Sequence, residues 1–273
     1  MSKLYVVGTP IGNLGDFSPR AVETLEKVDF IAAEDTRVTL KLLNRFGIKK
    51  SMVSYFEHNK RERGEMITER ILGGEACAMV TDAGMPAISD PGEDLVRLCH
   101  EKGIAVESVP GPCAFTTALA LSGFPSGRFT FEGFLSVNKP SRREHLRSLE
   151  NETRTMLFYE APHKLGATLR DMNKTFGNRE IAIVREITKL HEEVIRTTLD
   201  EAVEKYADGS VKGEIVLVIK GAEPKENDDI MTLEQAVELA KRSVEDGMSV
   251  SEAAKQTAKI SGCKKGDIYK ALI

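Results

Sequence analysis

The sequence predicts an α/β protein of two α/β domains, a parallel sheet in the first and a mixed sheet in the second, with a small helical C-terminal extension. In the first half, short and continuously apolar segments alternate with amphipathic segments, which is typical of a parallel sheet covered by helices on both faces. After Pro110-Gly111-Pro112 the apolar segments become less regular, which indicates a mixed sheet. Beyond residue 230 only helix-like segments occur.

The first predicted domain covers residues 1–118. Strands are expected where four or five apolar residues follow one another, and helices where residues such as Leu42, Leu43 and Phe46 recur on one side. We expect strands at residues 4–8, 30–34, 77–81 and 105–109, a short strand before residue 57, and helices at 18–28, 36–46, 60–72, 93–102 and 113–121.

The second predicted domain covers residues 119–222. Its strand-like segments are separated by helices only in places, so parallel and antiparallel neighbours are both expected in the sheet. We expect strands at residues 128–133, 155–159, 181–185, 193–197 and 214–220, and helices at 142–149, 163–176 and 199–207.

Residues 221–229 resemble a linker, because Pro224 and Asn227 lie there within a run of charges. The extension, residues 231–273, is expected to form helices at 232–246, at 251–260 and from Asp267, each beginning at a residue that favours helix caps. It carries seven basic and six acidic residues, a net charge of +1. An extension this small has little core of its own, so it either docks on the body or helps to hold a macromolecular partner.

Charge and composition limit the possible partners. The net charge of the chain is −4, so binding to nucleic acid would depend on local patches, and residues 60–63 and 139–147 are the basic candidates. Each is also compatible with a solvated helix face. No segment approaches the about 18–20 apolar residues of a membrane span, and no export signal precedes residue 4, so we expect a cytoplasmic protein without membrane contact.

Metal and redox chemistry find no support in the sequence. The four cysteines are far apart and form no C-x-x-C pair, so we expect reduced, mostly buried thiols and no metal site. Sequence motifs of zinc metalloproteases, serine hydrolases and P-loop nucleotide-binding proteins do not occur.

Three loops follow predicted parallel strands at the edge where ligands bind to open sheets. The first, residues 8–16, has proline at position 10 where the dinucleotide fingerprint has glycine, so a pyrophosphate site is disfavoured. The second, residues 81–92, is rich in Gly, Pro, Asp and small residues and favours a ligand site, with Met85 and Ile88 as an apolar wall. The third, residues 109–115, forms another strand-to-helix corner.

Charged residues end several predicted strands, which is typical of strands that converge on a cleft. For each of them a surface or capping role is an equal alternative. The candidates for general-base or charge-stabilising roles are Asp35, Arg37, His58, Glu160, His163 and Glu186.

These segments together resemble the tetrapyrrole methylase superfamily, and within it the bacterial small-subunit ribosomal RNA cytidine 2′-O-methyltransferases. The matching segments run in order over residues 4–221: 7–16, 33–37, 54–59, 81–92, 109–112, 158–163 and 185–189. The resemblance implies S-adenosylmethionine bound in a cleft between the two α/β domains, a homodimer, and 16S rRNA within the small ribosomal subunit as substrate.

The resemblance also implies the residues that bind the cofactor. Many relatives have Gly-Asp-Pro where this chain has Gly84-Met85-Pro86, so no role of that aspartate is carried over. The implied positions are Pro10, Ile11, Gly84, Met85, Pro86, Ile88, Cys113, Ala114, Tyr159 and Gly213.

Methyl transfer from a sulfonium requires the nucleophile, the methyl carbon and the sulfur to be nearly in line. A ribose hydroxyl is a weak nucleophile, so a general base or charge stabiliser is expected, and we rank Asp35, Arg37 and Glu186 first. Three other functions remain open at this point: a methyltransferase acting on a tetrapyrrole or other small molecule, a non-catalytic nucleotide- or RNA-binding module, and a nicotinamide dehydrogenase.

Overall fold

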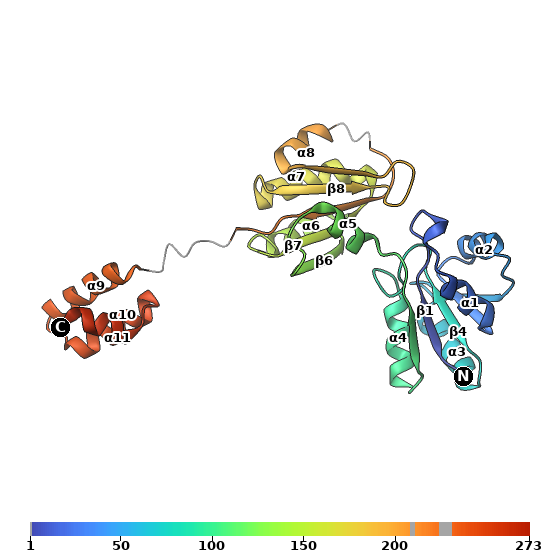
Figure 1. The fold of residues 1–273 in the computed structure, drawn as a ribbon, viewed down its shortest axis with the longest axis horizontal. Coiled ribbons are helices and arrows are strands. Elements are labelled where there is room, and N and C mark those ends of the chain that lie inside the picture. Colours follow the sequence, from blue (N-terminus) through green and yellow to red (C-terminus); the bar gives the residue numbers. More distant parts are fainter. Residues whose placement is uncertain (1, 208–210, 224–230) are drawn as a thin grey trace. The chain divides into compact units, whose positions relative to one another are not determined.

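The computed structural model describes residues 2–207, 211–223 and 231–273. Contacts among these residues divide the chain into two compact units, Met1–Ala222 and Glu223–Ile273. The first unit contains two five-stranded sheets and the second contains three helices (Figure 1). No described helix is long and apolar enough to cross a membrane.

The first sheet is parallel and has the strand order β3-β2-β4-β1-β5. Its central strands β2 and β4 are buried along their whole length, which explains their unbroken apolar sequences. The strands are β1 (Leu4–Val7), β2 (Phe30–Ala33), β3 (Ser51–Ser54), β4 (Cys77–Val80) and β5 (Val106–Val109).

Helices cover both faces of this sheet. Alternate strand residues pack on one side against α3 and α4 and on the other against α1 and α2, so the predicted two-sided parallel sheet is confirmed. The helices are α1 (Pro19–Lys27), α2 (Thr36–Arg45), α3 (Lys60–Leu72) and α4 (Gly92–Glu101), and a 3₁₀ turn, η1 (Leu14–Asp16), lies in the first loop.

The second sheet is mixed, with the order β6-β7-β10-β8-β9. Strands β6 and β7 are parallel and the other neighbours are antiparallel, as the irregular spacing of strands and helices predicted. A register shift between Phe131 and Gly133 places Gly133 at φ 63°. The strands are β6 (Phe129–Phe134), β7 (Thr155–Glu160), β8 (Glu180–Arg185), β9 (Glu193–Thr198) and β10 (Ile215–Ile219).

Helix α5 packs on one face of the second sheet, and three helices pack on the other. The predicted boundary after residue 118 falls within α5, whose Ala118 and Leu119 belong to the core of the second sheet. The helices are α5 (Ala114–Ser122), α6 (Lys139–Ser148), α7 (Leu165–Phe176) and α8 (Leu199–Lys205), with the 3₁₀ turn η2 (Pro162–Lys164) before α7.

The second unit consists of α9 (Leu233–Glu245), α10 (Val250–Ser261) and α11 (Lys265–Leu272). Its buried core is made of four alanines and Ile268. Thr232 and Gln235 form a capping box at the start of α9, and Gly262 adopts the left-handed conformation that ends α10.

Three sequence predictions require correction. Helix α6 begins at Lys139 rather than at residue 142, because Asn138 caps it and Pro140 suits the first turn. Helix α11 begins at Lys265, two residues before Asp267. The helix predicted over 163–176 begins as the 3₁₀ turn η2. Most of the predicted linker, residues 224–230, lies outside the described residues.

The four cysteines are free, as predicted, with Cys77 and Cys99 buried and Cys113 and Cys263 partly buried. Among the described residues no cluster of His, Cys, Asp and Glu could hold a metal ion.

Candidate functional site

The loops after β1 and β4 are joined at the carboxyl edge of the first sheet. Thr9 and Gly84 exchange backbone hydrogen bonds of 2.9 and 3.2 Å, and the Thr9 hydroxyl donates to the carbonyl oxygen of Thr81 at 3.1 Å. Because β1 and β4 are neighbours in the sheet, these two loops emerge side by side. The predicted convergence of loops at this edge is therefore present.

A close approach of two glycines brings the third loop to the same place. A Cβ atom at Gly8 would lie 2.7 Å from the Cα atom of Gly111, so neither position accommodates a side chain. The sulfur of Met85 accepts a hydrogen bond from the Gly111 amide at 3.3 Å. Met85 thus fills the space under the third loop and packs against the core of the first sheet.

A pocket of about 380 Å³ lies at these loops, within the range of small-molecule sites. Both sheets contribute to its wall. Its lining consists of Ile11, Glu34, Thr81, Ala83, Ile88, Ser89, Asp90 and Ala114 from the first half of the chain, and Phe134, Tyr159, Glu160, Ala161, Pro162, Ile187, Gly213, Glu214, Ile215 and Val216 from the second.

The ionisable residues of the lining are acidic: Glu34, Asp90, Glu160 and Glu214, with a tyrosine beside them. No lysine, arginine or histidine is among the lining residues that the structure describes. Lysines outside the lining pair with Glu160 and Glu214, at 3.2 and 3.0 Å, so the negative potential in the cavity comes from Glu34 and Asp90. The pocket therefore favours a cationic ligand.

Asp90 is the carboxylate whose bonding is incomplete. Its Oδ1 atom accepts hydrogen bonds from the amides of Ala87 and Gly92, at 3.0 and 2.7 Å, whereas its Oδ2 atom is buried and has no partner among the described residues. Burial raises the pKa of Asp90, and the nearby charge of Glu34 adds to this effect. A buried acceptor without a donor is costly unless a ligand supplies one.

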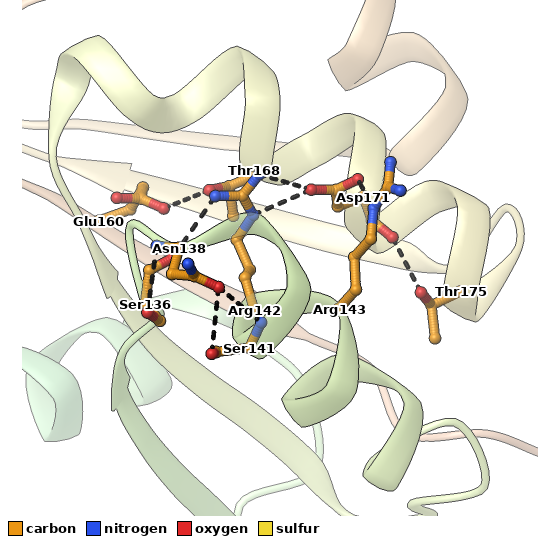
Figure 2. A network of polar contacts seen from close by, with 9 residues as sticks. All are labelled: Ser136, Asn138, Ser141, Arg142, Arg143, Glu160, Thr168, Asp171 and Thr175. Carbon is orange, nitrogen blue, oxygen red and sulfur yellow. Dashed lines mark hydrogen bonds and ion pairs between the residues drawn. The ribbon is translucent and has the colours of Figure 1, made fainter.

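Two other carboxylates of the pocket are held by hydroxyl groups. The Thr81 hydroxyl and the Asp82 amide donate to Oε2 of Glu34, the latter at 3.3 Å. Oε2 of Glu160 accepts a hydrogen bond from the Thr168 hydroxyl at 2.5 Å (Figure 2). The Nζ atom of Lys164 lies 3.2 Å from Oε1 of Glu160. Glu160 is almost fully buried, so its orientation is fixed from α7.

Aromatic and aliphatic side chains form the apolar part of the wall. Tyr159 contacts Phe131 and Phe134, with ring centroids 5.0 and 5.3 Å apart, and burial raises the pKa of Tyr159 to about 12. Phe134 is 57% exposed at the pocket. Together with Ile11 and Ile88 these rings provide a surface for a planar apolar group.

The backbone is strained on two sides of the pocket. Among the described residues, the four non-glycine residues with positive φ are Ala87 and Ser89 in one loop and Glu186 and Thr188 in another. Lining residues Ile88 and Ile187 lie between the members of each pair. Such conformations persist only where surrounding contacts enforce them, and they cluster at ligand sites.

The predicted cofactor-binding residues divide into two groups. Ile11, Ile88, Ala114, Tyr159 and Gly213 line the pocket. The others, Pro10, Gly84, Met85, Pro86 and Cys113, lie in the same loops but outside the lining, and Met85 faces the core rather than the cavity.

The predicted catalytic residues are more dispersed. Asp35 and Arg37 form a two-pronged ion pair at 3.0 and 2.6 Å, and the hydrogen bonds from Arg37 lower the pKa of Asp35 to about 2. The side chain of Arg37 is 87% exposed. His58 and His163 are exposed, and neither lines the pocket.

Glu160 lines the pocket, and Glu186 lies directly behind its wall. Glu186 accepts a hydrogen bond from the Glu214 amide at 2.9 Å and forms an ion pair with Lys189 at 2.9 Å. Both interactions lower the pKa of Glu186, and the bond from Lys189 has the larger effect. Lys189 also packs against the first loop, where a Cβ at Gly12 would lie 2.6 Å from its Cγ atom.

Sequence reasoning missed Glu34, Asp90, Glu214 and Phe134 as lining residues. Glu34 ends a predicted strand and Asp90 lies in the predicted ligand loop, residues 81–92, so these positions were the available signal. Glu214 and Phe134 carried no comparable signal.

Comparison with known proteins agrees with this geometry. The family model of the tetrapyrrole (corrin/porphyrin) methylases matches residues 3–203. Ribosomal RNA small subunit methyltransferase I of Synechocystis sp. is 44% identical over 270 residues, which is 98% of this chain and 96% of the relative. The protein of the same name from Thermotoga maritima is 49% identical over 223 residues, which is 82% of this chain but 100% of the relative.

Solved structures show the same fold at low identity. The methyltransferase CobJ superposes with a TM-score of 0.61 and 18% identity, covering 81% of this chain and 95% of its own. Uroporphyrin-III C-methyltransferase from Thermus thermophilus, complexed with S-adenosylhomocysteine, gives a TM-score of 0.53 and 18% identity, covering 80% and 97%.

Proposed function

Because the chain belongs to the tetrapyrrole methylase family, and within it to the ribosomal RNA small subunit methyltransferase I proteins, we propose that it methylates 16S rRNA with S-adenosylmethionine. We further propose the 2′-oxygen of a cytidine ribose as the acceptor. The observation that carries the proposal is the acidic pocket at the strand ends, whose charge suits a sulfonium cofactor.

The lining residues fit this cofactor chemically. S-adenosylmethionine carries a sulfonium and an ammonium group, and the ammonium can pair with the carboxylate of Asp90, which lines the pocket. The apolar surface of Ile11, Ile88 and Tyr159 suits an adenine ring. Gly213 leaves room at the wall where any side chain would meet Glu186.

The cofactor supplies an electrophilic methyl group, so the residues of the chain have to orient the ribose hydroxyl and accept its proton. Asp35 is a poor proton acceptor because its pKa is about 2 and Arg37 binds both of its oxygens. Glu186 is likewise occupied, by Lys189 and the Glu214 amide. Both carboxylates are better suited to orienting neighbouring groups than to accepting a proton.

We propose Glu34 as the general base. It lines the pocket, and its described hydrogen bonds from Thr81 and Asp82 both use Oε2, which leaves Oε1 for a substrate hydroxyl. Arg37 forms a two-pronged ion pair with Asp35, and its side chain is highly exposed. Its guanidinium is therefore suited to bind an RNA phosphate near the pocket.

The test is transfer of labelled methyl groups to small ribosomal subunits, to free 16S rRNA and to tetrapyrrole precursors, each in a separate reaction. We expect label in ribosomal RNA, and mass spectrometry of nucleosides should identify 2′-O-methylcytidine. Label in a tetrapyrrole alone would contradict the proposal and favour the small-molecule alternative.

Two variants separate the base from the binding residues. Glu34→Gln should lower kcat by roughly 10²–10⁴-fold, the typical range for a general base, with little change in cofactor affinity. Glu26→Gln, at an exposed position of α1, is the matched control and should behave as wild type. Full activity of Glu34→Gln would exclude this role.

We also propose that the enzyme is a cytoplasmic homodimer, since its proposed substrate is assembled in the cytoplasm and the family resemblance implies two subunits. Light scattering of the purified full chain should give twice the 30.1 kDa of one chain.

A further inference from the structure

Helices α10 and α11 form a helix-turn-helix. Three residues, 262–264, connect Ser261 at the end of α10 to Lys265 at the start of α11, and Gly262 turns the chain with φ 71°. A turn of three or four residues, often with glycine, is common between the two helices of such a motif. Ile268 of α11 packs into the alanine core with Ala253 and Ala254 of α10, so α11 is held by one side only.

Charge is distributed unevenly within this unit. Residues 250–273 contain five lysines and two acidic residues, whereas residues 233–246 contain four acidic and two basic residues. Since the whole chain has a net charge of −4 and residues 231–273 have +1, the rest carries −5. The helix-turn-helix is therefore a local basic region in an acidic protein.

The outer side of α11 combines positive charge with an open backbone. Lys265, Tyr269 and Lys270 are exposed, and helical spacing places them with Gly266 along one face of α11, on which Lys270 lies opposite Ile268. A Cβ atom added at Gly266, between them, would meet no neighbouring atom within 4 Å. Gly266 costs helix stability relative to alanine, by about 1 kcal/mol, without serving any packing contact.

Asp267, an exposed carboxylate of the same helix, forms no ion pair with these lysines in the described part of the chain. Among the described residues, the ion pair of this region joins Lys255 to Glu252 at 4.0 Å, and Lys265 makes one contact, 3.4 Å to the Ser251 hydroxyl. Lys259, Lys264 and Lys270 form no ion pair within the described part of the chain. Their charge is available to a partner with negative charge.

We propose that this face of α11, made of Lys265, Gly266, Tyr269 and Lys270, binds the phosphate backbone of the 16S rRNA substrate. The proposal rests on the proposed function, which supplies RNA as the polyanion near the enzyme. The deep major groove of A-form RNA does not admit a helix, so the contact is to phosphates and to an unpaired base on Tyr269. Its contribution is to affinity rather than to chemistry.

The relative from Thermotoga maritima supports a role of the C-terminal unit that is separate from the chemistry at the pocket. An alignment of 223 residues covers the whole of that protein, so about 50 residues of this chain have no counterpart there. The family model likewise ends at residue 203, before the second unit. The pocket and its loops lie within the part that the relatives share.

The test compares two charge-matched double variants of the full chain. Lys265→Gln with Lys270→Gln removes two charges from the proposed face, and Lys241→Gln with Arg242→Gln removes two from exposed positions of α9 in the same unit. Affinity for a fluorescent 16S rRNA fragment is measured against salt concentration. The α11 variant should lose several-fold in affinity, with the slope of log K against log salt reduced by about 2.

Activity on small ribosomal subunits provides the second measurement. The α11 variant should show a raised KM and an unchanged kcat, and calorimetry should give wild-type affinity for S-adenosylmethionine. Tyr269→Ala should weaken RNA binding without changing the salt slope, because stacking is not ionic. The α9 variant should match wild type in all of these measurements.

Each contrary outcome has a distinct meaning. Equal losses in the α11 and α9 variants, or no loss in either, would overturn the proposed face. Unchanged binding to free rRNA with weakened binding to whole subunits would overturn it in favour of a ribosomal protein as partner. Failure of the wild type to methylate subunits would contradict the proposed function, whereas the RNA affinities would still decide the role of α11.

Discussion

Gly213 lies directly against the carboxyl group of Glu186: a Cβ atom at this position would be 2.5 Å from the Cδ atom of Glu186. The two segments are joined on both sides of this contact, because the Glu186 amide donates to the Glu214 carbonyl at 3.0 Å and the Glu214 amide donates to the Glu186 carboxylate at 2.9 Å. This contact sets the position of the pocket wall at residues 213–214.

Gly213→Ala should therefore displace the wall. The new methyl group would meet Glu186, and φ of +91° is unfavourable for alanine. We expect at least a tenfold loss of S-adenosylmethionine affinity, measured by calorimetry. Gly177→Ala is the control, since Gly177 also has positive φ (+70°) but open space around it; this change should lower stability by about 1–3 kcal/mol and leave affinity unchanged.

Asp90→Asn tests the unpartnered oxygen. Asparagine keeps an oxygen for the amides of Ala87 and Gly92 but removes the negative charge, so affinity for the cationic cofactor should fall by roughly tenfold or more. Because burial raises the pKa of Asp90 in the folded state, its ionisation opposes folding at neutral pH. The variant should thus melt at the wild-type temperature or higher.

The same residue predicts a pH dependence of binding. Asp90 binds a proton at a higher pH than an ordinary carboxyl, so cofactor affinity should weaken as pH falls toward the raised pKa. In Asp90→Asn this loss should be smaller. Asp246→Asn, exposed at the end of α9, should reproduce the wild-type profile, and an identical profile for Asp90→Asn would refute the assignment.

Arg142 and Asp171 form a buried ion pair, and breaking it should lower the free energy of unfolding. Arg142 donates twice to Oδ2 of Asp171, at 2.9 and 2.6 Å, and Arg143 donates to Oδ1 at 2.9 Å (Figure 2). Asp171→Asn leaves a buried guanidinium without a counter-charge and should cost about 3–5 kcal/mol in denaturant unfolding. Replacing both partners, with Arg142→Met and Asp171→Leu, should cost less.

Asp171 also contributes to acid unfolding. Burial opposes its ionisation, but the hydrogen bonds from Arg142 and Arg143 outweigh burial and lower its pKa. A carboxyl with a lowered folded pKa stabilises above its unfolded pKa of about 3.9, and this stabilisation is lost as pH falls through the folded value. The unfolding free energy should therefore fall more between pH 7 and pH 3 for wild type than for Asp171→Asn.

Thr168→Val tests how Glu160 is held. The change removes the hydroxyl that donates to Oε2 and leaves a buried carboxylate short of a donor, at a cost of about 1–3 kcal/mol. Cofactor affinity should fall with it. Thr175→Val, on the same helix, removes a hydroxyl that donates only to a backbone carbonyl, so a smaller cost and normal affinity are expected.

The first sheet could be predicted from sequence because its signal is local. Four-residue apolar strands such as Phe30–Ala33 are buried on both faces. Burial on both faces requires an unbroken apolar sequence, which can be recognised in each strand by itself. The second sheet was predicted as mixed from the spacing of its strands and helices, whereas Pro140 and the cap Asn138 were overlooked at the start of α6.

The pocket chemistry could be predicted only in part, because it depends on contacts between distant segments. Glu34 is held at the pocket by a hydrogen bond from Thr81, which lies 47 positions later in the chain. Arg142 belongs to the predicted basic segment 139–147, but its guanidinium pairs with Asp171 on another helix. Met85 was expected to form an apolar wall of the ligand site, but its side chain lies beneath Gly111 instead. No periodicity or local motif records such pairings.

The alanine core of the C-terminal unit has a consequence for its dynamics. Alanine methyl groups bury much less apolar area than the leucine and phenylalanine side chains of the two sheets, so the unit has less free energy of folding to protect its backbone amides. Its amides should exchange with deuterium earlier than those of β10, and a partner that binds only the folded helices should slow that exchange by mass action. Hydrogen exchange would thus report occupancy of the extension separately from turnover at the pocket.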